Sequence, residues 1–341
     1  MWVTSSLTTA LSPANVALGN FDGVHLGHQA VIAKILHQTP QRDLSMSQVL
    51  GERSESEPGS RLKRERGDRS YATVVSFSPH PQEFFSGQRR SLLTPVNEKV
   101  EQLRSLGVEQ LVLLPFTQAL ARLSPEAFVE EILRRYLNAK RVSVGENFHF
   151  GRDRSGNSQR LRQIGQQYHI ETCISGLQEL DGDRISSSTI RQALAAGQIQ
   201  PANRLLGRPY RLNGTVELGQ QLGRRLGFPT ANLKLPEDKF LPHWGVYSTW
   251  VQLDDGTHHP GVMNLGCRPT VAGDRPSVEV HLLDWDGDLY DRPLSLHLMT
   301  FLRPEQQFPG LDALTAQIRQ DCQTARSHLD SLPNPGSSLT P

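Results

Sequence analysis

Short apolar runs alternate with amphipathic stretches through the first half of the chain. The apolar runs predict strands over residues 15–18, 73–77, 108–115 and 141–144. The amphipathic stretches predict helices over residues 97–106 and 125–137, and a further helix that follows the first strand and reaches about residue 36. Strands that alternate with helices indicate a doubly wound α/β domain, Rossmann-like, with a parallel sheet.

The pattern changes near residue 200, where short strands follow one another closely. Two short helices (190–194 and 201–206) and a Gly-Arg-Pro linker come first. Strands are then predicted over residues 210–216, 245–253, 261–265, 277–283 and 294–301. Gly, Pro and Asp turns between closely spaced strands are typical of a small antiparallel β-barrel. A final helix over residues 311–326 is expected to pack on this barrel through the stripe Leu311, Leu314, Ile318 and Cys322.

We therefore predict two domains, residues 1–200 and 207–330, followed by a flexible tail at 331–341. Residues 39–70 interrupt the first domain, and from 52 to 69 acids and bases alternate with Ser, Gly and Pro around a single large apolar residue, Leu62. So little apolar surface cannot offset the entropy lost on ordering, which predicts a disordered insertion. A basic phosphate-binding loop is the alternative, and the interleaved acids disfavour it.

Composition narrows the function classes. Apolar residues make up 37% of the 341 positions, and no uninterrupted apolar run approaches the roughly 20 residues that span a bilayer. The first residues lack the basic charge of a signal or transit peptide. A net charge of +1 gives no case for binding nucleic acid or anionic lipid. Three widely spaced cysteines suit a reducing compartment, so we expect a cytoplasmic enzyme or ligand-binding protein.

The segment from Gly19 to His28 follows the first strand and opens the first helix. Its glycines permit a tight turn, and a helix N-terminus attracts phosphate. His25 and His28, three positions apart, lie on one face and offer hydrogen bonds to a triphosphate. An ordinary helix cap is the plainer interpretation. A zinc site is disfavoured because no third ligand stands at a suitable spacing.

A second segment, from Ser186 to Arg191, places hydroxyl groups at a helix start with the arginine one turn inside. Hydroxyl and N–H groups there suit a leaving pyrophosphate, and the guanidinium of Arg191 suits the charge that develops on it. Taken alone, the segment is equally an ordinary Ser-capped helix.

Together the two segments resemble the nucleotidylyltransferase superfamily, and more narrowly the FMN adenylyltransferase module of bacterial bifunctional riboflavin kinase/FAD synthetases. Segments 76–81 (SFSPHP) and 145–151 (GENFHFG) support the narrower resemblance. It implies that Asn147 and Phe148 bind flavin and that His28 and Arg191 are catalytic. It also implies an ATP site made of Gly19, Phe21, Asp22, Gly23, His25, Gly27, His28, Ser186, Ser187, Ser188 and Arg191.

Three positions depart from this family pattern. Asn147 and His149 stand where the family usually has Asp and a basic residue, and Ser188 stands for Thr and keeps the hydroxyl. The lost charge at position 147 is expected to slow adenylyl transfer or alter its specificity without abolishing it.

A Gly-rich stretch, residues 214–232, carries the second set of candidate residues. Gly219, Gly223 and Gly227, with Arg224 between them, suit a flexible flap over phosphates. Thr230 and Asn232 offer two hard oxygen ligands for Mg²⁺ shared with ATP. A Gly-rich hairpin is an equally good interpretation of these residue types alone.

The string from Gly223 to Asn232, GRRLGFPTAN, resembles the signature of riboflavin kinase, and segments 245–247, 264–270, 278–281, 288–290 and 301–303 also match that family in order. The resemblance implies that Pro229 joins the nucleotide site, that Arg303 binds flavin and that Glu279 is the general base. Alternation along strand 277–283 turns Glu279 outward, where a solvated glutamate is the plainer interpretation. Asp291 departs from the family's Gly, in a turn.

The two resemblances predict an enzyme that uses ATP to phosphorylate riboflavin to FMN and then to adenylylate FMN to FAD, with Mg²⁺ as cofactor. The expected partners are these small molecules, with no nucleic acid and no membrane, and a homo-oligomer stays open. The alternative is a riboflavin kinase whose first domain only binds flavin or nucleotide. A nucleotidylyltransferase for another phosphate acceptor is less favoured, because the kinase half supplies FMN.

Overall fold

The computed structural model describes residues 1–36, 69–219, 222–268 and 275–332. The chain divides into two compact units, one made of Met1–Arg89 with Lys99–Gln178 and the other of Arg90–Glu98 with Glu179–Pro341. Residues 179–200, placed in the first domain on sequence, group with the second unit. The predicted insertion 39–70 and tail 331–341 lie outside the described residues, except for 69–70 and 331–332.

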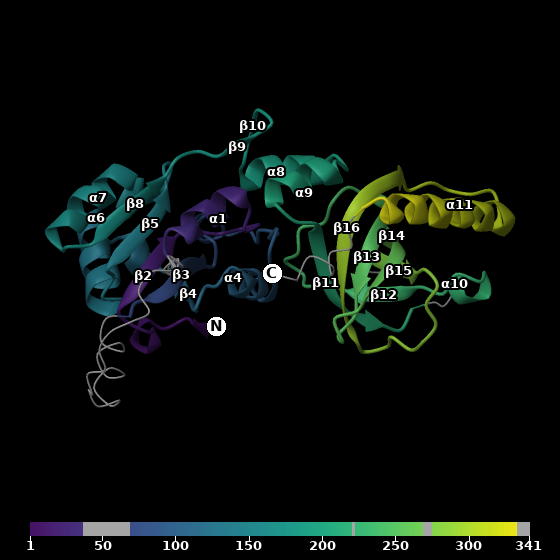
Figure 1. Ribbon diagram of the computed structural model, residues 1–341, viewed down its shortest axis with the longest axis horizontal. Coiled ribbons are helices and arrows are strands. Elements are labelled where there is room, and N and C mark those ends of the chain that lie inside the picture. The colour runs from purple at the N-terminus through teal and green to yellow at the C-terminus, as the bar shows by residue number, and fades with distance from the viewer. Residues whose placement is uncertain (37–68, 220–221, 269–274, 333–341) are drawn as a thin grey trace, which may run out of the picture. The chain divides into compact units, whose positions relative to one another are not determined.

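The first unit is built on a six-stranded parallel sheet in the order β1-β4-β3-β2-β5-β8 (Figure 1). Its strands are β1 (Trp2–Thr4), β2 (Ala14–Leu18), β3 (Tyr71–Ser78), β4 (Gln110–Pro115), β5 (Arg141–Gly145) and β8 (Glu171–Ser175). The α/β class and the four strands predicted in this half are confirmed. β1 and β8 were not predicted because they are short edge strands without an apolar run.

Helices cover both faces of this sheet, as a parallel sheet requires. They are η1 (Leu7–Thr9), α1 (Leu26–Ala33), α3 (Pro81–Ser86), α4 (Val96–Ser105), α5 (Gln118–Ala121), α6 (Pro125–Phe128), η2 (Val129–Tyr136), η3 (Arg152–Arg154) and α7 (Ser158–Gln167), beside the short hairpin β6 (His149–Phe150)–β7 (Gly156–Asn157). Val16 and Leu18 point into one core and Ala17 into the other. The predicted helix 125–137 is a turn of α-helix continued by π-helix.

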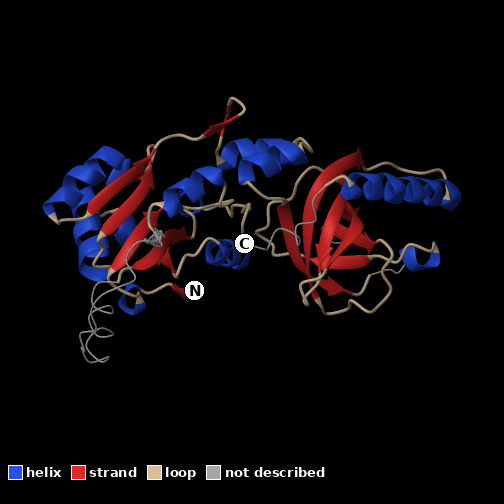
Figure 2. Ribbon diagram, in the orientation of Figure 1, coloured by secondary structure: helices blue, strands red, loops and turns tan. Residues whose placement is uncertain are grey.

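The second unit is a closed barrel, whose strands are the red arrows on the right of Figure 2. Its strand order is β11-β12-β15-β14-β13-β16, with antiparallel pairing throughout. The strands are β11 (Tyr210–Glu217), β12 (Ala231–Lys234), β13 (Gly245–Gln252), β14 (His258–Arg268), β15 (Arg275–Leu282) and β16 (Pro293–Pro304). The remaining elements are β9 (Glu179–Leu180), β10 (Asp183–Arg184), α8 (Ser187–Ala195), α9 (Ile199–Leu206), α10 (Leu222–Arg225) and α11 (Leu311–Asp330). The predicted barrel and final helix are confirmed.

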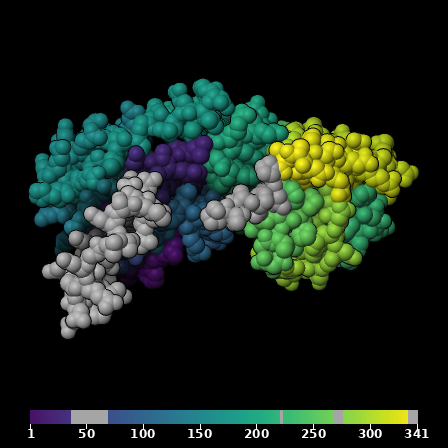
Figure 3. All heavy atoms as spheres, viewed as in Figure 1, coloured from purple at the N-terminus to yellow at the C-terminus, as the bar shows by residue number. Residues whose placement is uncertain are grey.

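Helix α11 lies on the outside of the barrel, where its atoms form the yellow ridge in Figure 3. Its seam differs from the predicted stripe, because Leu311 is 57% exposed. Ala325 instead packs with Val246, Val262 and Leu283 in a small apolar cluster, and Cys322 borders it. The stripe is therefore wrong at its first position, and the contact with the barrel extends beyond residue 322.

Residues 90–98 are part of the second unit through backbone and charge contacts. Leu92 exchanges backbone hydrogen bonds with the loop before β13, at Asp238 and Phe240. The Lys239 ammonium donates to the Leu93 carbonyl (2.9 Å) and to Glu98 (2.6 Å). Burial raises the pKa of Glu98, an effect that Lys239 opposes. With side chains 8% and 1% exposed, Glu98 and Lys239 form a buried ion pair.

Lys239→Met should lower the free energy of unfolding of the second unit by about 3 kcal/mol, because it leaves a carboxylate buried with less counter-charge. The matched control is Lys234→Met, at an exposed pair with Glu217 whose loss should cost less than about 1 kcal/mol. Urea unfolding followed by tryptophan fluorescence measures both, since Trp244, Trp250 and Trp285 lie in this unit. Equal midpoints for the two variants would contradict the expectation.

Candidate active sites

The turn between β2 and α1 is strained and buried. Phe21 (φ 48°) and Val24 (φ 43°) have left-handed backbone conformations that side chains other than Asn or Asp rarely adopt, and Gly23 has φ 94°. Phe21 and Val24 are each 1% exposed and Asp22 is 4% exposed. Left-handed residues with bulky side chains concentrate at functional sites, because the surrounding structure must enforce them.

The two histidines of this segment lie at the start of α1. His25 is the N-cap residue, and its Nδ1 accepts a hydrogen bond from the His28 amide at 3.2 Å. The plainer capping interpretation is therefore correct for Nδ1, and in the neutral ring the proton is on Nε2. The two rings stack with centroids 3.6 Å apart. Stacked rings at a helix N-terminus still suit an anionic ligand through their Nε2 atoms and the helix dipole.

The strand order brings three of the predicted segments to one edge of the sheet. β2 has β3 on one side and β5 on the other, so the order of connection reverses there, and ligands of doubly wound sheets bind at such a switch point. The turn 19–25 follows β2, segment 76–81 ends β3 and segment 145–151 follows β5. The Ser76 hydroxyl donates to the Asn20 carbonyl at 3.0 Å, which joins the first two directly.

The segment after β5 exposes polar groups above an aromatic base. Asn147 and His149 are exposed, and the His149 Nδ1 donates to the Asn147 carbonyl at 2.9 Å. Phe148 stacks on the buried Phe150 (centroids 5.6 Å apart), which also contacts Phe128. Both departures from the family pattern therefore lie in one exposed turn, where the side chain of His149 is held by backbone rather than by another charge.

The Ser186 segment belongs to the second unit. Ser186 is the N-cap of α8, and its hydroxyl accepts from the Thr189 amide at 3.1 Å. Ser187 is partly buried and Ser188 is exposed. Arg191 donates to the Ser91 carbonyl (2.8 Å), and its guanidinium lies 4.8 Å from the centre of the Phe240 ring. The Ser-capped helix is present as described, and the roles of these residues toward ATP stay predictions.

Glu279 lies on the outer surface of the barrel, as the alternation of β15 predicts. Val278 and Val280 are buried in the core, and Glu279 is partly exposed between them. It stands opposite Asn232 of β12 on one side and Asn264 of β14 on the other. The Thr230 hydroxyl is 3.5 Å from its Oε2. The structure thus groups the predicted base with both predicted magnesium ligands, and these oxygens are of the type Mg²⁺ prefers.

Glycines let the loop that precedes β12 pack closely. A Cβ at Gly219 would lie 2.0 Å from the side-chain Nδ2 of Asn232, and one at Gly223 would lie 2.3 Å from the backbone carbonyl oxygen of Phe228. Gly227 has φ 86°. Gly223 and Arg224 belong to the one-turn helix α10, and residues 220–221 of the predicted flap lie outside the described residues. At Gly219 and Gly223 the missing side chain leaves room for the Asn232 side chain and the Phe228 backbone, whether or not the loop is also flexible.

His281, to which the sequence interpretation gave no site role, holds the same loop. Its Nδ1 donates to the Pro229 carbonyl at 2.8 Å, and its ring meets the Phe228 ring edge-on. Because ladder pairing between β12 and β15 begins only at Ala231, this contact fixes the segment just before it. The alternation of β15 that places Glu279 on the outer surface also places His281 there. This alternation is the sequence signal from which a role for His281 could have been predicted.

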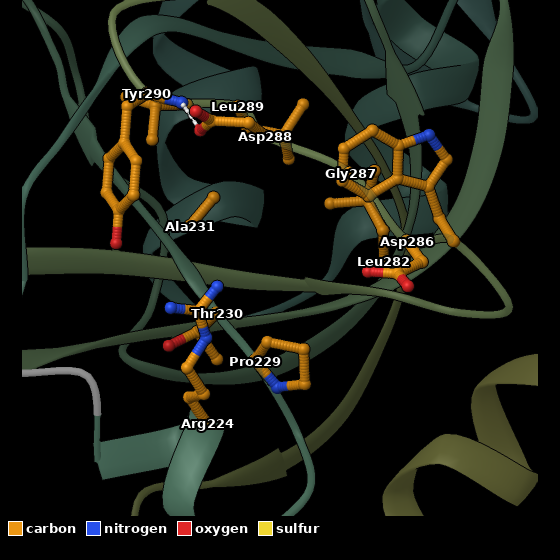
Figure 4. A pocket seen from close by; sticks show the side chains of 12 residues that line it. Arg224, Pro229, Thr230, Ala231, Leu282, Asp286, Gly287, Asp288, Leu289 and Tyr290 are labelled. Atoms are coloured by element: carbon orange, nitrogen blue, oxygen red, sulfur yellow. Dashed lines mark hydrogen bonds between the residues drawn. The ribbon is translucent and has the colours of Figure 1, made fainter.

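An open cavity of about 640 Å³ lies beside Thr230. In Figure 4 the segment from Asp286 to Tyr290 forms one side, and Arg224, Pro229 and Thr230 form the other. The Asp288 carboxylate accepts from the Tyr290 amide at 3.0 Å. The size suits a nucleotide-like ligand. Sequence reasoning matched 288–290 to the family but gave these residues no site role.

Arg303 lies near the end of β16, and its guanidinium binds the buried Asp321 of α11 through Nε and Nη2, at 2.7–3.1 Å. The guanidinium carbon of Arg303 lies 5.6 Å from the centre of the Phe308 ring. These contacts anchor α11 to the barrel, and the flavin-binding role of Arg303 stays a prediction.

Comparisons with known proteins agree with both halves. A family model described as FAD synthetase matches residues 7–52 and 60–189, and one described as riboflavin kinase matches residues 206–329. Bifunctional riboflavin kinase/FMN adenylyltransferases of Pseudomonas fluorescens and Escherichia coli K12 are 40% and 36% identical to the chain, each over 91% of both sequences. The corresponding Bacillus subtilis protein is 32% identical over 93% of both.

The fold is also that of a Streptococcus pneumoniae crystal structure titled a macrolide-efflux protein, with a TM-score of 0.77, 25% identity, and coverage of 95% of this chain and 98% of that one. A shared fold does not transfer an activity, and that title describes the other protein. In the described part of the chain, no helix has the length and apolarity needed to cross a membrane. On the family models and the identities over nine-tenths of its length, the chain belongs to the family of bifunctional riboflavin kinase/FMN adenylyltransferases.

Proposed function

We propose that the barrel phosphorylates riboflavin to FMN with ATP, and that the sheet unit carries the transfer of AMP from a second ATP to FMN, giving FAD and pyrophosphate. The observation that carries the kinase half is the grouping of Glu279 with Thr230 and Asn232 on the outer surface of the barrel. The adenylyl half is supported by the strained turn 19–25 at the switch point of the sheet.

In the kinase reaction Glu279 accepts the proton of the ribityl 5′-hydroxyl. The hydroxyl oxygen then forms a bond to the γ-phosphorus of ATP, and the bond to the leaving ADP breaks. Thr230 and Asn232 would hold Mg²⁺, which neutralises phosphate charge when bound. His281 keeps Pro229 and Thr230 in place beside the carboxylate. The neighbouring cavity accommodates the nucleotide, with Arg224 at its rim.

In the adenylyl reaction a phosphate oxygen of FMN attacks the α-phosphorus of ATP, and pyrophosphate leaves. No protein nucleophile is needed, so the residues orient the phosphates and stabilise charge. His25, through Nε2, and His28 donate to phosphate oxygens at the N-terminus of α1. Ser186, Ser187, Ser188 and Arg191 are proposed to bind ATP, an assignment that the FAD synthetase model supports for the three serines, because it extends to residue 189. Asn147 and Phe148 contact the flavin.

We place both reactions in the cytoplasm, where ATP is available. The three cysteines are all free thiols, as is usual in a reducing compartment.

Purified protein incubated with riboflavin, ATP and Mg²⁺ should form FMN first and then FAD. Chromatographic separation of the flavins over time measures both steps. FMN that accumulates without FAD would favour the alternative, in which the first unit only binds flavin or nucleotide, and would direct attention to Asn147 and His149. The absence of any FMN would contradict the kinase assignment itself.

Glu279→Gln should reduce riboflavin phosphorylation by about 10²–10⁴-fold, because the amide cannot accept the hydroxyl proton. Adenylylation of supplied FMN should continue in the same protein, and circular dichroism compared with the wild-type protein checks that the barrel is folded. The matched control is Glu237→Gln, at an exposed glutamate in the loop after β12. An equal loss of both activities would argue against separate sites.

His28→Ala should have the reverse effect and reduce FAD formation from FMN by about 10²–10³-fold, the usual result of removing one donor to a developing negative charge. Riboflavin phosphorylation should be retained. His28→Gln keeps a side-chain N–H in a similar place and should recover part of the activity. If His28→Ala forms FAD at the normal rate, the ring does not contact the reacting phosphates.

A further inference from the structure

Lys99 is a buried lysine that neither proposed reaction uses. It lies in the first turns of α4 and is 5% exposed. Its ammonium nitrogen is 2.9 Å from the Asn20 carbonyl oxygen and 3.3 Å from the Ser76 hydroxyl. The Ser76 hydroxyl donates to the same carbonyl at 3.0 Å. One carbonyl at the start of the strained turn therefore accepts from two buried donors, one of them charged.

We propose that Lys99 is a positioning residue for adenylyl transfer, whose ammonium group holds the turn at residues 19–25 in the conformation that presents His25 and His28 to the ATP phosphates. The inference rests on the proposed function of the first unit. In this proposal Lys99 does not contact substrate and acts through the Asn20 carbonyl.

The turn needs such an anchor because its backbone is unfavourable. Phe21 and Val24 each cost roughly 1–2 kcal/mol in their left-handed conformations. The Asn20 carbonyl belongs to the peptide group directly before Phe21, so a fixed carbonyl also fixes the backbone that enters the left-handed residue. A hydrogen bond from a charged donor contributes about twice as much as a neutral one, which makes Lys99 the stronger of the two donors.

Asp22 strengthens the case. It is buried in the same turn, and its carboxylate favours the charged form of Lys99. Burial nevertheless dominates and lowers the pKa of Lys99 to about 8. The groups that face the ammonium are Asp22 and the Asn20 carbonyl from the turn and the Ser76 hydroxyl from β3, while Glu98 precedes it on α4. The charge that anchors the turn is therefore lost as the pH rises through about 8.

Activity and stability should then move in opposite directions. Adenylyl transfer falls above pH 8 as Lys99 becomes neutral. Between pH 8 and the ordinary lysine pKa of about 10.4, the unfolded chain binds more protons at this residue than the folded chain does, so this group makes the protein more stable as the pH rises. A merely structural lysine would not produce an alkaline decline in one activity without a loss of stability.

Lys99→Met should lower kcat/KM for FAD formation by about 100-fold, the typical effect of misplaced catalytic groups, and should remove the decline near pH 8. Ser76→Ala should have a smaller effect and keep that decline. Lys140→Met, at an exposed lysine of the same unit, is the matched control. Riboflavin phosphorylation by each full-length variant shows whether the second unit is intact, and circular dichroism compared with the wild-type protein shows whether the first unit is folded. A folded Lys99→Met protein with normal FAD formation and an unchanged pH profile would overturn the inference.

Hydrogen exchange at residues 19–28 gives a second measurement that needs no FAD. Lys99→Met should speed exchange of these amides about tenfold or more relative to Lys140→Met, because the turn opens more readily. Unchanged exchange would overturn the inference. A wild-type protein that forms no FAD would instead contradict the proposed function, while the exchange experiment would still decide the role of Lys99.

Discussion

The backbone turn that follows β2 is the constraint on which the first unit depends. Two residues other than glycine, Phe21 and Val24, have left-handed backbone conformations there. Each costs roughly 1–2 kcal/mol, which other interactions of the turn must offset. Burial of Phe21 and Val24, at about 1.5–3 kcal/mol for a fully buried side chain, offsets this cost. The hydrogen bonds from Lys99 and Ser76 to the Asn20 carbonyl hold the backbone in this conformation. The turn can therefore persist without ligand, with the N-terminus of α1 already aimed at the switch point of the sheet. Preorganisation of this kind spares the protein from ordering the loop when nucleotide binds.

In the barrel, the alternation of side chains along one strand fixes the position of the proposed base. One strand, β15, provides both core and chemistry, because its side chains alternate between the two surfaces. Val278 and Val280 fill the interior, and Glu279 and His281 meet the loop that precedes β12. A shift of one residue in the pairing of β15 would bury the carboxylate and expose the valines. The same packing that closes the barrel therefore fixes the position of the proposed base.

The sequence predicted most of this architecture, and the failures have physical causes. Regular alternation predicted the central strands, whereas β1 and β8 lie at sheet edges and lack an apolar run. β12 was overlooked because Thr230 and Asn232 were interpreted as ligands rather than as part of a strand boundary. Motifs indicated Glu279 and the His25 segment, but Lys99 carried no signal, since a lysine on an amphipathic helix is normally solvated. Only the tertiary structure shows that it is buried against the Asn20 carbonyl.

The second unit is discontinuous in sequence, and the ion pair between Glu98 and Lys239 links its two segments. A chain cut after residue 178 yields a C-terminal fragment without the Leu93 carbonyl and the Glu98 carboxylate, two groups to which the Lys239 ammonium donates. In the fragment the Lys239 ammonium would have to be hydrated or deprotonated, whereas in the intact protein it is buried and charged. Separation of the chain at this point would therefore destabilise the barrel as well as remove the first unit.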